Sequence, residues 1–122
     1  MRAFKNAWFA RFARRSQISD EQLKVALAQA SRGLIDADLG GGVIKQRIAR
    51  PGEGKSGGYR TIVLYRQGKR AFFVYGYAKS CEANIRQADL LQFRKMATLV
   101  QSLSDEDLAL ALAHGVFEEV QS

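Results

Sequence analysis

The 122-residue chain contains one cysteine, one histidine and one proline, and these scarcities exclude several classes of protein. The single cysteine, Cys81, cannot form a disulfide within the chain, which is typical of a reducing compartment. His114 is the only histidine, and no group of Cys, His and carboxylate residues has metal-ligand spacing, so the sequence predicts no metal site and no cofactor. No apolar run approaches the roughly 20 residues that cross a bilayer. We therefore expect a cytoplasmic protein with no membrane partner.

Acidic residues are also scarce in the middle of the chain. Residues 45–79 contain nine Lys and Arg residues and a single acid, Glu53, a balance of +8 in a chain whose net charge is +7. Such a basic block favours a polyanionic partner, and nucleic acid is the first candidate. The alternative is a solvated face on a generally basic protein.

The stretch GEGKS at residues 52–56 partly matches a phosphate-binding P-loop. The P-loop pattern requires a glycine at position 49, which is Ala49 here, and a helix directly after the loop. In this chain Gly57 and Gly58 follow instead, and then a strand pattern begins. The sequence thus argues against nucleotide hydrolysis and predicts a basic, glycine-rich loop that fits against a phosphate backbone.

Length and periodicity predict one α+β domain over residues 1–122. Phe4, Trp8 and Phe12 recur at helical spacing, and Ser19 begins a capping-box pattern, so we expect an N-terminal helical hairpin over 4–33. A change to alternating periodicity predicts an antiparallel β-meander over 43–79.

The remaining elements complete the expected architecture. Residues 2–5 can add a strand, giving a small antiparallel sheet of three to four strands in total. Helices are expected over 84–115, with Ser104 as a cap and Gly115 as a stop. We expect the helices to pack on one face of the sheet and leave the other face at least partly free.

Alternation along the strands places cations and tyrosines together on that free face. We expect Arg60, just after the glycine-rich turn, to reach the same groove. Guanidinium groups bind phosphate and phenol rings stack on bases, so the set favours an RNA site. The alternative is that the tyrosines are simply good strand formers. In the third strand, alternation places Phe73, Tyr75, Tyr77 and Lys79 on one face. The residues expected on the free face of the sheet are Lys45, Arg47, Tyr75, Tyr77 and Lys79.

The stretch DADLGGGVIKQRIARPGEGKSGGYRTIVLY, followed by RAFFVYGYAKS and EANI, resembles toxins of the RelE/ParE superfamily. It is most similar to the HigB-like branch of bacterial type II toxin–antitoxin systems, and the similarity extends over essentially the whole chain. The specific feature is the order of K-x-R, a basic glycine-rich loop, G-Y-R, an aromatic strand and A-K. The resemblance implies a RelE-like fold, ribosome-dependent cleavage of mRNA, and a cognate antitoxin protein that forms a hetero-oligomer with the toxin.

The resemblance also implies roles for individual residues. By motif position, Lys45 and Arg47 match the basic pair, Arg60 the arginine after G-Y, and Lys79 the final basic position. Relatives often have a further tyrosine where this chain has SCEANI, and Tyr77 is expected to substitute for it. The expected RNA-binding residues are Arg50, Lys55, Lys69, Arg70 and Tyr75.

The implied chemistry is metal-independent attack of the RNA 2′-OH on the neighbouring phosphorus. Lys45 is expected to act as general base or proton relay, while Arg47 and Arg60 stabilise phosphoryl charge. Lys79 is expected to protonate the leaving group or hold phosphate, and Tyr77 to stack on a base. Two alternatives stay open: a ParE-like inhibitor of DNA gyrase, and a nucleic-acid-binding module without catalysis.

Overall fold

The computed structural model describes residues 1–50, 54–81 and 85–121, without the side chains of residues 50, 54–57 and 81. The chain begins with strand β1 (Arg2–Asn6) and helices α1 (Ala7–Arg15) and α2 (Asp20–Ser31). Four strands follow: β2 (Ala37–Gly40), β3 (Val43–Arg50), β4 (Gly54–Tyr65) and β5 (Arg70–Ala78). The last elements are the short 3-10 helix η1 (Lys79–Cys81), helices α3 (Gln87–Gln101) and α4 (Asp105–Ala113), and strand β6 (Phe117–Glu119).

The strands form one six-stranded mixed sheet in the order β2-β3-β4-β5-β1-β6. The β1–β5 pair is parallel, and the other described pairs are antiparallel. The expected meander is confirmed as β3-β4-β5, and residues 2–5 do belong to a strand. The sheet is larger than the predicted three to four strands, and it is mixed, whereas an antiparallel sheet was predicted. The strands β2 and β6 were not predicted, and they have only 4 and 3 residues. Strands this short give too little alternation to be recognised in a sequence.

Phe4 lies in β1, so the predicted helix start at residue 4 is wrong. The ring of Phe4 is fully buried and stacks on Phe72 of the neighbouring strand, with centroids 5.0 Å apart. The helix begins at Ala7 because the side-chain oxygen of Asn6 accepts a hydrogen bond from the Phe9 N–H at 2.7 Å. The capping boundaries expected at Ser19, Ser104 and Gly115 are confirmed.

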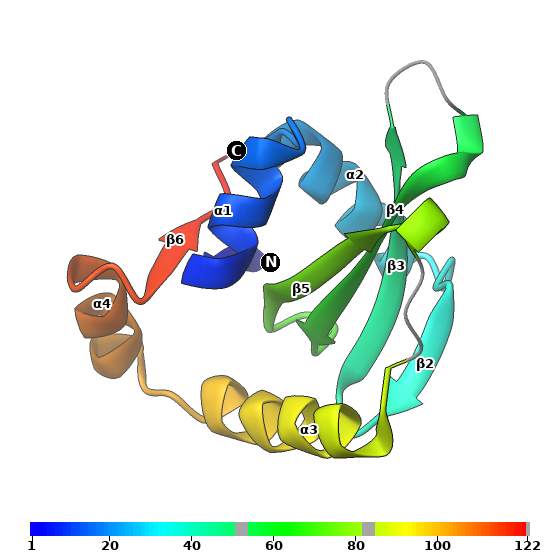
Figure 1. The fold of residues 1–122 in the computed structure, drawn as a ribbon. Coiled ribbons are helices and arrows are strands. Elements are labelled where there is room, and N and C mark those ends of the chain that lie inside the picture. The colour runs from blue at the N-terminus through cyan, green and yellow to red at the C-terminus, as the bar shows by residue number, and fades with distance from the viewer. Residues whose placement is uncertain (51–53, 82–84, 122) are drawn as a thin grey trace.

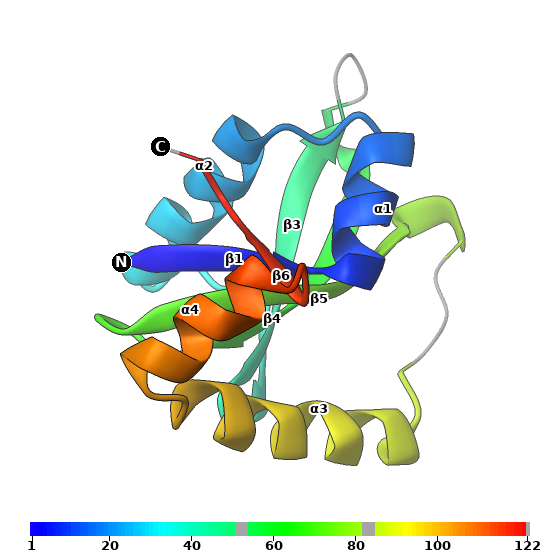
Figure 2. The same ribbon diagram turned by 90° about the vertical axis from the view of Figure 1, so that its left-hand side faces the viewer.

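Helices cover both faces of the sheet, which corrects the expectation that they pack on one face (Figures 1 and 2). On the first face, α1 and α2 bury Phe9, Leu23 and their neighbours against the sheet. On the second face, α3 and α4 cover an apolar area that includes Ile62 and Phe72. No helix in the described parts of the chain is long and apolar enough to cross a membrane.

The turn between β2 and β3 brings α3 close to the sheet. It consists of Gly40, Gly41 and Gly42, all at positive φ, a backbone region that favours glycine. The side chain of Arg94 from α3 lies across this turn and donates a hydrogen bond to the Leu39 carbonyl. A Cβ added at position 41 would lie 2.8 Å from Arg94 Cγ. The glycines therefore allow α3 to approach the end of the sheet.

Asp20 joins three separate segments of the chain. Its Oδ1 accepts a hydrogen bond from Lys5 Nζ in β1 at 2.8 Å, and its Oδ2 accepts one from the Gln121 N–H at 2.8 Å. Partial burial alone would raise the pKa of Asp20, but these two donors outweigh it and hold the pKa below its ordinary value. The carboxylate thus stabilises the fold in its ionised form.

Substitution of Gly41 tests the packing of α3 on the turn. Gly41→Ala should lower the free energy of unfolding by about 2–3 kcal/mol, since backbone strain at positive φ adds to a clash with Arg94. Gly33 is the matched control, because it also has positive φ but has no other group within 4 Å of an added Cβ. Gly33→Ala should cost only about 1 kcal/mol in urea denaturation. Equal losses in the two variants would contradict the proposed clash.

The lowered pKa of Asp20 predicts acid sensitivity. A depressed native pKa adds stability above the unfolded-state pKa, and this stability is lost as the pH falls through the native value. Asp20→Asn should therefore lower unfolding free energy at pH 7 by about 1–2 kcal/mol and flatten its decline in acid. Urea denaturation from pH 7 downward measures both effects. An unchanged acid profile would show that Asp20 does not contribute this linkage.

Candidate functional site

Arg47, Arg60 and Tyr77 lie in one row across three neighbouring strands. The register pairs Arg47 of β3 with Arg60 of β4, and Arg60 with Tyr77 of β5. Directly opposed residues of antiparallel strands share a face, so the three side chains leave the sheet on the same side. Lys45 and Tyr75 belong to the adjacent row on that face, through Ile62. The register confirms the prediction that Lys45 and Arg47 share a face of the sheet with Tyr75 and Tyr77.

A β-bulge in β5 separates Phe73 from this face. Val63 pairs with Phe73 and Ile62 pairs with Tyr75, so Val74 is an extra residue without an opposing partner. Phe73 is fully buried on the α1 side, with its ring centroid 5.2 Å from that of Phe9. The expectation that Phe73 shares a face with the tyrosines is therefore wrong, because strict alternation fails at the bulge.

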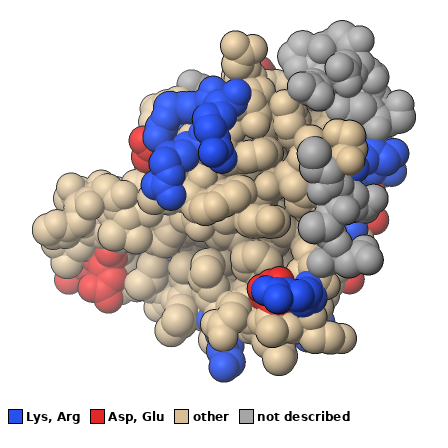
Figure 3. Space-filling view, viewed as in Figure 1, with Lys and Arg blue, Asp and Glu red and all other residues tan. Residues whose placement is uncertain are grey.

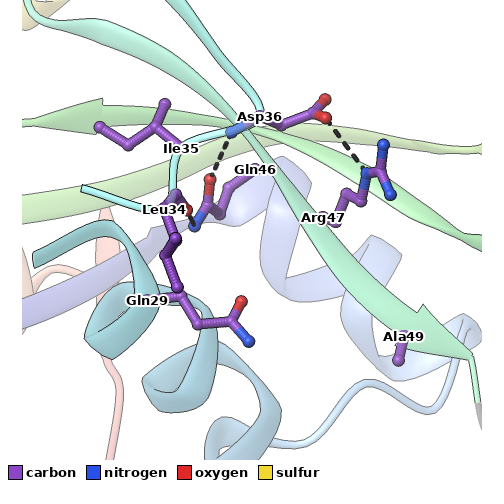
Figure 4. A pocket seen from close by; sticks show the side chains of 7 residues that line it. All are labelled: Gln29, Leu34, Ile35, Asp36, Gln46, Arg47 and Ala49. Atoms are coloured by element: carbon purple, nitrogen blue, oxygen red, sulfur yellow. Dashed lines mark hydrogen bonds and ion pairs between the residues drawn. The ribbon is translucent and has the colours of Figure 1, made fainter. Parts of the chain in front are cut away.

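One carboxylate bridges the two arginines of the row. Asp36 Oδ1 accepts a hydrogen bond from Arg47 Nε at 3.1 Å (Figure 4). Asp36 Oδ2 lies 3.3 Å from Arg60 Nε. The side chain of Arg60 is only 7% exposed, whereas that of Arg47 is 48% exposed. Arg60 Nη1 is buried and has no hydrogen-bond partner among the described residues. Arg47 is thus the accessible arginine, with the second positive charge buried beside it.

The loop that carries Asp36 is anchored by a buried amide. Gln46 is 2% exposed, and its Oε1 accepts a hydrogen bond from the Asp36 N–H at 3.1 Å. Its Nε2 donates to the carbonyl oxygens of Ala26 in α2 and Leu34, at 3.0 and 2.9 Å. The backbone carbonyl of Gln46 accepts from Thr61 Oγ1 at 3.0 Å. Gln46 therefore connects helix α2, strands β3 and β4, and the Asp36 loop.

A pocket of about 410 Å³ lies beside this arrangement, between α2, the Asp36 loop and β3 (Figure 4). It lies along β3 where pairing with β2 has ended, since the last pair joins Ala37 and Lys45. Its lining combines aliphatic, amide and charged groups. The residues that line it are Gln29, Leu34, Ile35, Asp36, Gln46, Arg47 and Ala49.

The tyrosine rings take part in packing between helices. The Tyr75 centroid lies 4.6 Å from that of Trp8 in α1 and 6.2 Å from that of Phe93 in α3. The ring centroid of Tyr77 lies 6.2 Å from that of Tyr75, and Tyr77 is 8% exposed. In this conformation the two rings join α1, β5 and α3.

The other predicted site residues are spread along the sheet. Lys79 is half-buried in η1, directly after β5 and therefore near the row. Lys69 is exposed in the β4–β5 turn, and Arg70 begins β5, about 20 Å from Tyr77 along the strand. The side chains of Arg50 and Lys55 lie outside the described residues. The structure thus brings Lys79 close to the row but keeps Lys69 and Arg70 at the far end of the strand.

The guanidinium group of Arg70 makes hydrogen bonds within the fold. Its Nη1 donates to the carbonyl oxygens of Val100 and Leu103 at 3.2 and 2.8 Å, and its Nη2 to Asp105 Oδ1 at 3.0 Å. These acceptors lie where α3 ends and α4 begins. Arg70 therefore joins the helical corner to the sheet.

The described residues contain no group of three or more His, Cys, Asp and Glu side chains that could hold a metal ion. His114 is exposed and caps the end of α4.

A comparison with known protein families identifies a match over almost the whole chain. The model of the family described as the RelE toxin of the RelE/RelB toxin–antitoxin system matches residues 1–120. The chain belongs to the RelE toxin family. No match is found among curated proteins. RelE toxins pair with a RelB antitoxin, and the family typically consists of ribosome-dependent mRNA endonucleases.

Two residues that contact or support the arginine row, Asp36 and Gln46, were missed by sequence reasoning. Asp36 lies outside the basic block, and nothing in its local pattern indicates contact with arginines 11 and 24 positions away. Gln46, in contrast, could have been recognised from the sequence, since it occupies the apolar face of β3 between Ile44 and Ile48. A buried amide at such a position has to find hydrogen-bond partners.

The contacts of Arg70 predict a structural role in this RelE-family chain. Arg70→Met should lower the free energy of unfolding by about 1–3 kcal/mol, because two helix-end carbonyls and Asp105 lose a charged donor. Lys69→Met, the exposed neighbour, should change it by less than about 0.5 kcal/mol. Thermal and urea unfolding measure the difference. Stability as high in Arg70→Met as in Lys69→Met would contradict this role.

Proposed function

We propose that this chain is a ribosome-dependent mRNA endoribonuclease of the HigB-like branch, which inhibits translation and is neutralised by a cognate antitoxin. The Arg47–Arg60–Tyr77 row supports the proposal, because it places two guanidinium groups and a phenol on one face. Lys45 lies in the adjacent row, and Lys79 follows the end of β5. The site therefore offers cations and hydroxyl groups for phosphoryl transfer on RNA.

The proposed reaction is an intramolecular transesterification. The ribose 2′-OH attacks the adjacent phosphorus, the bond to the 5′-oxygen breaks, and a 2′,3′-cyclic phosphate and a free 5′-OH are formed. Lys45 takes or relays the proton from the 2′-OH, and Lys79 supplies one to the departing 5′-oxygen. Arg47, the exposed arginine, contacts the scissile phosphate. Arg60 adds positive potential from the buried side.

Dependence on the ribosome follows from the chemistry of these groups. Lysine and arginine side chains are ordinarily almost fully protonated near neutral pH and are therefore poor general bases, so the intrinsic rate on free RNA should be small. A ribosome that holds the 2′-OH in line with the scissile phosphate supplies the missing orientation. Since RelE toxins pair with RelB antitoxins, we further propose that a cognate antitoxin covers this cationic face.

Cleavage by the purified protein on programmed ribosomes tests the proposal. The wild type should cut mRNA within codons, leave cyclic phosphate ends, and be insensitive to EDTA. Arg47→Lys should lose most of the rate with little loss of binding, because it keeps the charge but loses the planar two-donor geometry. Arg66→Lys is the matched control: Arg66 is an exposed arginine just after β4, and the change should leave the rate unaltered.

Three results would contradict the proposal. EDTA-sensitive cleavage of free RNA would indicate a metal-dependent nuclease. Trapped gyrase–DNA breaks without message cleavage would support the ParE-like alternative. RNA binding with no cleavage in the presence of ribosomes would indicate a binding module without catalysis.

A further inference from the structure

We propose that Asp36 is a positioning residue that holds the guanidinium groups of Arg47 and Arg60 in the orientation required for phosphate. This inference rests on the proposed function, in which Arg47 contacts the scissile phosphate and Arg60 adds positive potential from the buried side. It assigns a role to an acidic residue that lies outside the basic segment of the chain.

The first argument is electrostatic. Arg47 and Arg60 are directly opposed on neighbouring strands, and like charges in such pairs repel each other. The side chain of Asp36 is 17% exposed and contacts the Nε atoms of both, at 3.1 and 3.3 Å. One carboxylate therefore offsets the repulsion and provides the buried Arg60 with a counter-charge. Without it, the exposed guanidinium of Arg47 would turn toward water.

The second argument is the geometry of the contacts. Both arginines use Nε toward Asp36, so the Nη atoms at the other edge of each guanidinium are not used by these two contacts. Arg60 Nη1 is buried without a hydrogen-bond partner among the described residues. Donors held in this way are oriented before an anion arrives.

The third argument is that Asp36 is itself fixed in place. Its N–H donates to Gln46 Oε1 at 3.1 Å, and Gln46 is bound in turn to α2 and β4. The carboxylate thus has a rigid support that a solvated surface acid would lack. A flexible acid beside a phosphate site would only weaken RNA binding by repulsion, whereas a fixed one can determine where the arginines point.

Asp36→Asn separates these two effects, because it removes the charge at nearly constant shape. Binding to a 2′-O-methyl RNA oligonucleotide, which lacks the nucleophile, should tighten roughly two- to fivefold at low salt, since the positive charge of the site rises. The salt dependence should also steepen, by up to about 0.7 in the slope of log K against log salt for one additional phosphate contact. Single-turnover cleavage on programmed ribosomes should nevertheless fall by at least about tenfold, because the arginines lose their orientation.

Asp38→Asn is the matched control, since Asp38 is an exposed acid two residues further on whose Oδ1 accepts from the Gly40 N–H. It should leave the cleavage rate unchanged. Asp36→Glu keeps both carboxylate oxygens and should recover part of the rate lost in Asp36→Asn. The arginine Nε–Hε resonances in ¹H–¹⁵N spectra give a readout that needs no activity: those of Arg47 and Arg60 should shift in Asp36→Asn and stay in place in Asp38→Asn.

The outcomes distinguish failure of the inference from failure of the proposed function. If the wild type cleaves no mRNA, the proposed function is wrong, and the resonances and salt slope still decide whether Asp36 holds the two arginines. A folded Asp36→Asn with unchanged resonances, or with weaker RNA binding and an unchanged salt slope, would overturn the inference. If Asp36→Asn does not fold, Asp36→Glu decides: a folded Glu variant that shifts neither arginine resonance and cleaves at the wild-type rate also overturns it.

Discussion

The buried guanidinium of Arg60 is the constraint on which the surrounding structure depends. A charge this deeply buried requires a counter-charge, and the only acid that meets it in the described structure comes from the Asp36 loop. That loop must therefore lie against the row, and Gln46 secures it to α2 and β3. The arginine row, the short strand β2 and the end of α2 consequently form one connected unit. The pocket beside Arg47 is bounded by the same elements.

The second face of the sheet is divided by composition, and the division determines what can cover it. Near α3 the face is apolar, with Val43, Ile62 and Leu64 all buried, so a helix packs there. Toward Arg47 and Arg60 the same face is cationic, and an apolar helix face could not cover it without burying unpaired charge. The same division continues in β5. Before the bulge at Val74, Phe72 and Phe73 point to opposite faces and belong to the two different cores. After the bulge, Tyr75 and Tyr77 lie on the same face as Arg47 and Arg60.

Local patterns in the sequence predict the meander, the helix caps and the shared face of Lys45 and Arg47 well. Each of these depends on a few neighbouring residues whose periodicity or capping chemistry is visible in the chain. The start of α1 was missed because β1 is a strand through its pairing with β5 and β6, and both of these interactions are non-local. Asp36 was missed for the same reason, since its partners are assembled by the register of β3 and β4.

The net charge of a segment is also an incomplete guide to a binding surface. Two of the nine cations in residues 45–79 are paired within the fold: Arg60 is buried against Asp36, and Arg70 binds the α3–α4 corner. Conversely, α1 presents Arg11, Arg14 and Arg15 to solvent, and Figure 3 shows a cluster of basic side chains over its position. Long-range attraction of a polyanion depends on the sum of these charges, wherever they lie in the sequence. The proposed phosphoryl transfer depends instead on the orientation of a few groups within ångströms. For Arg47 and Arg60, the strand register, the burial of Arg60 and the contacts with Asp36 define that orientation.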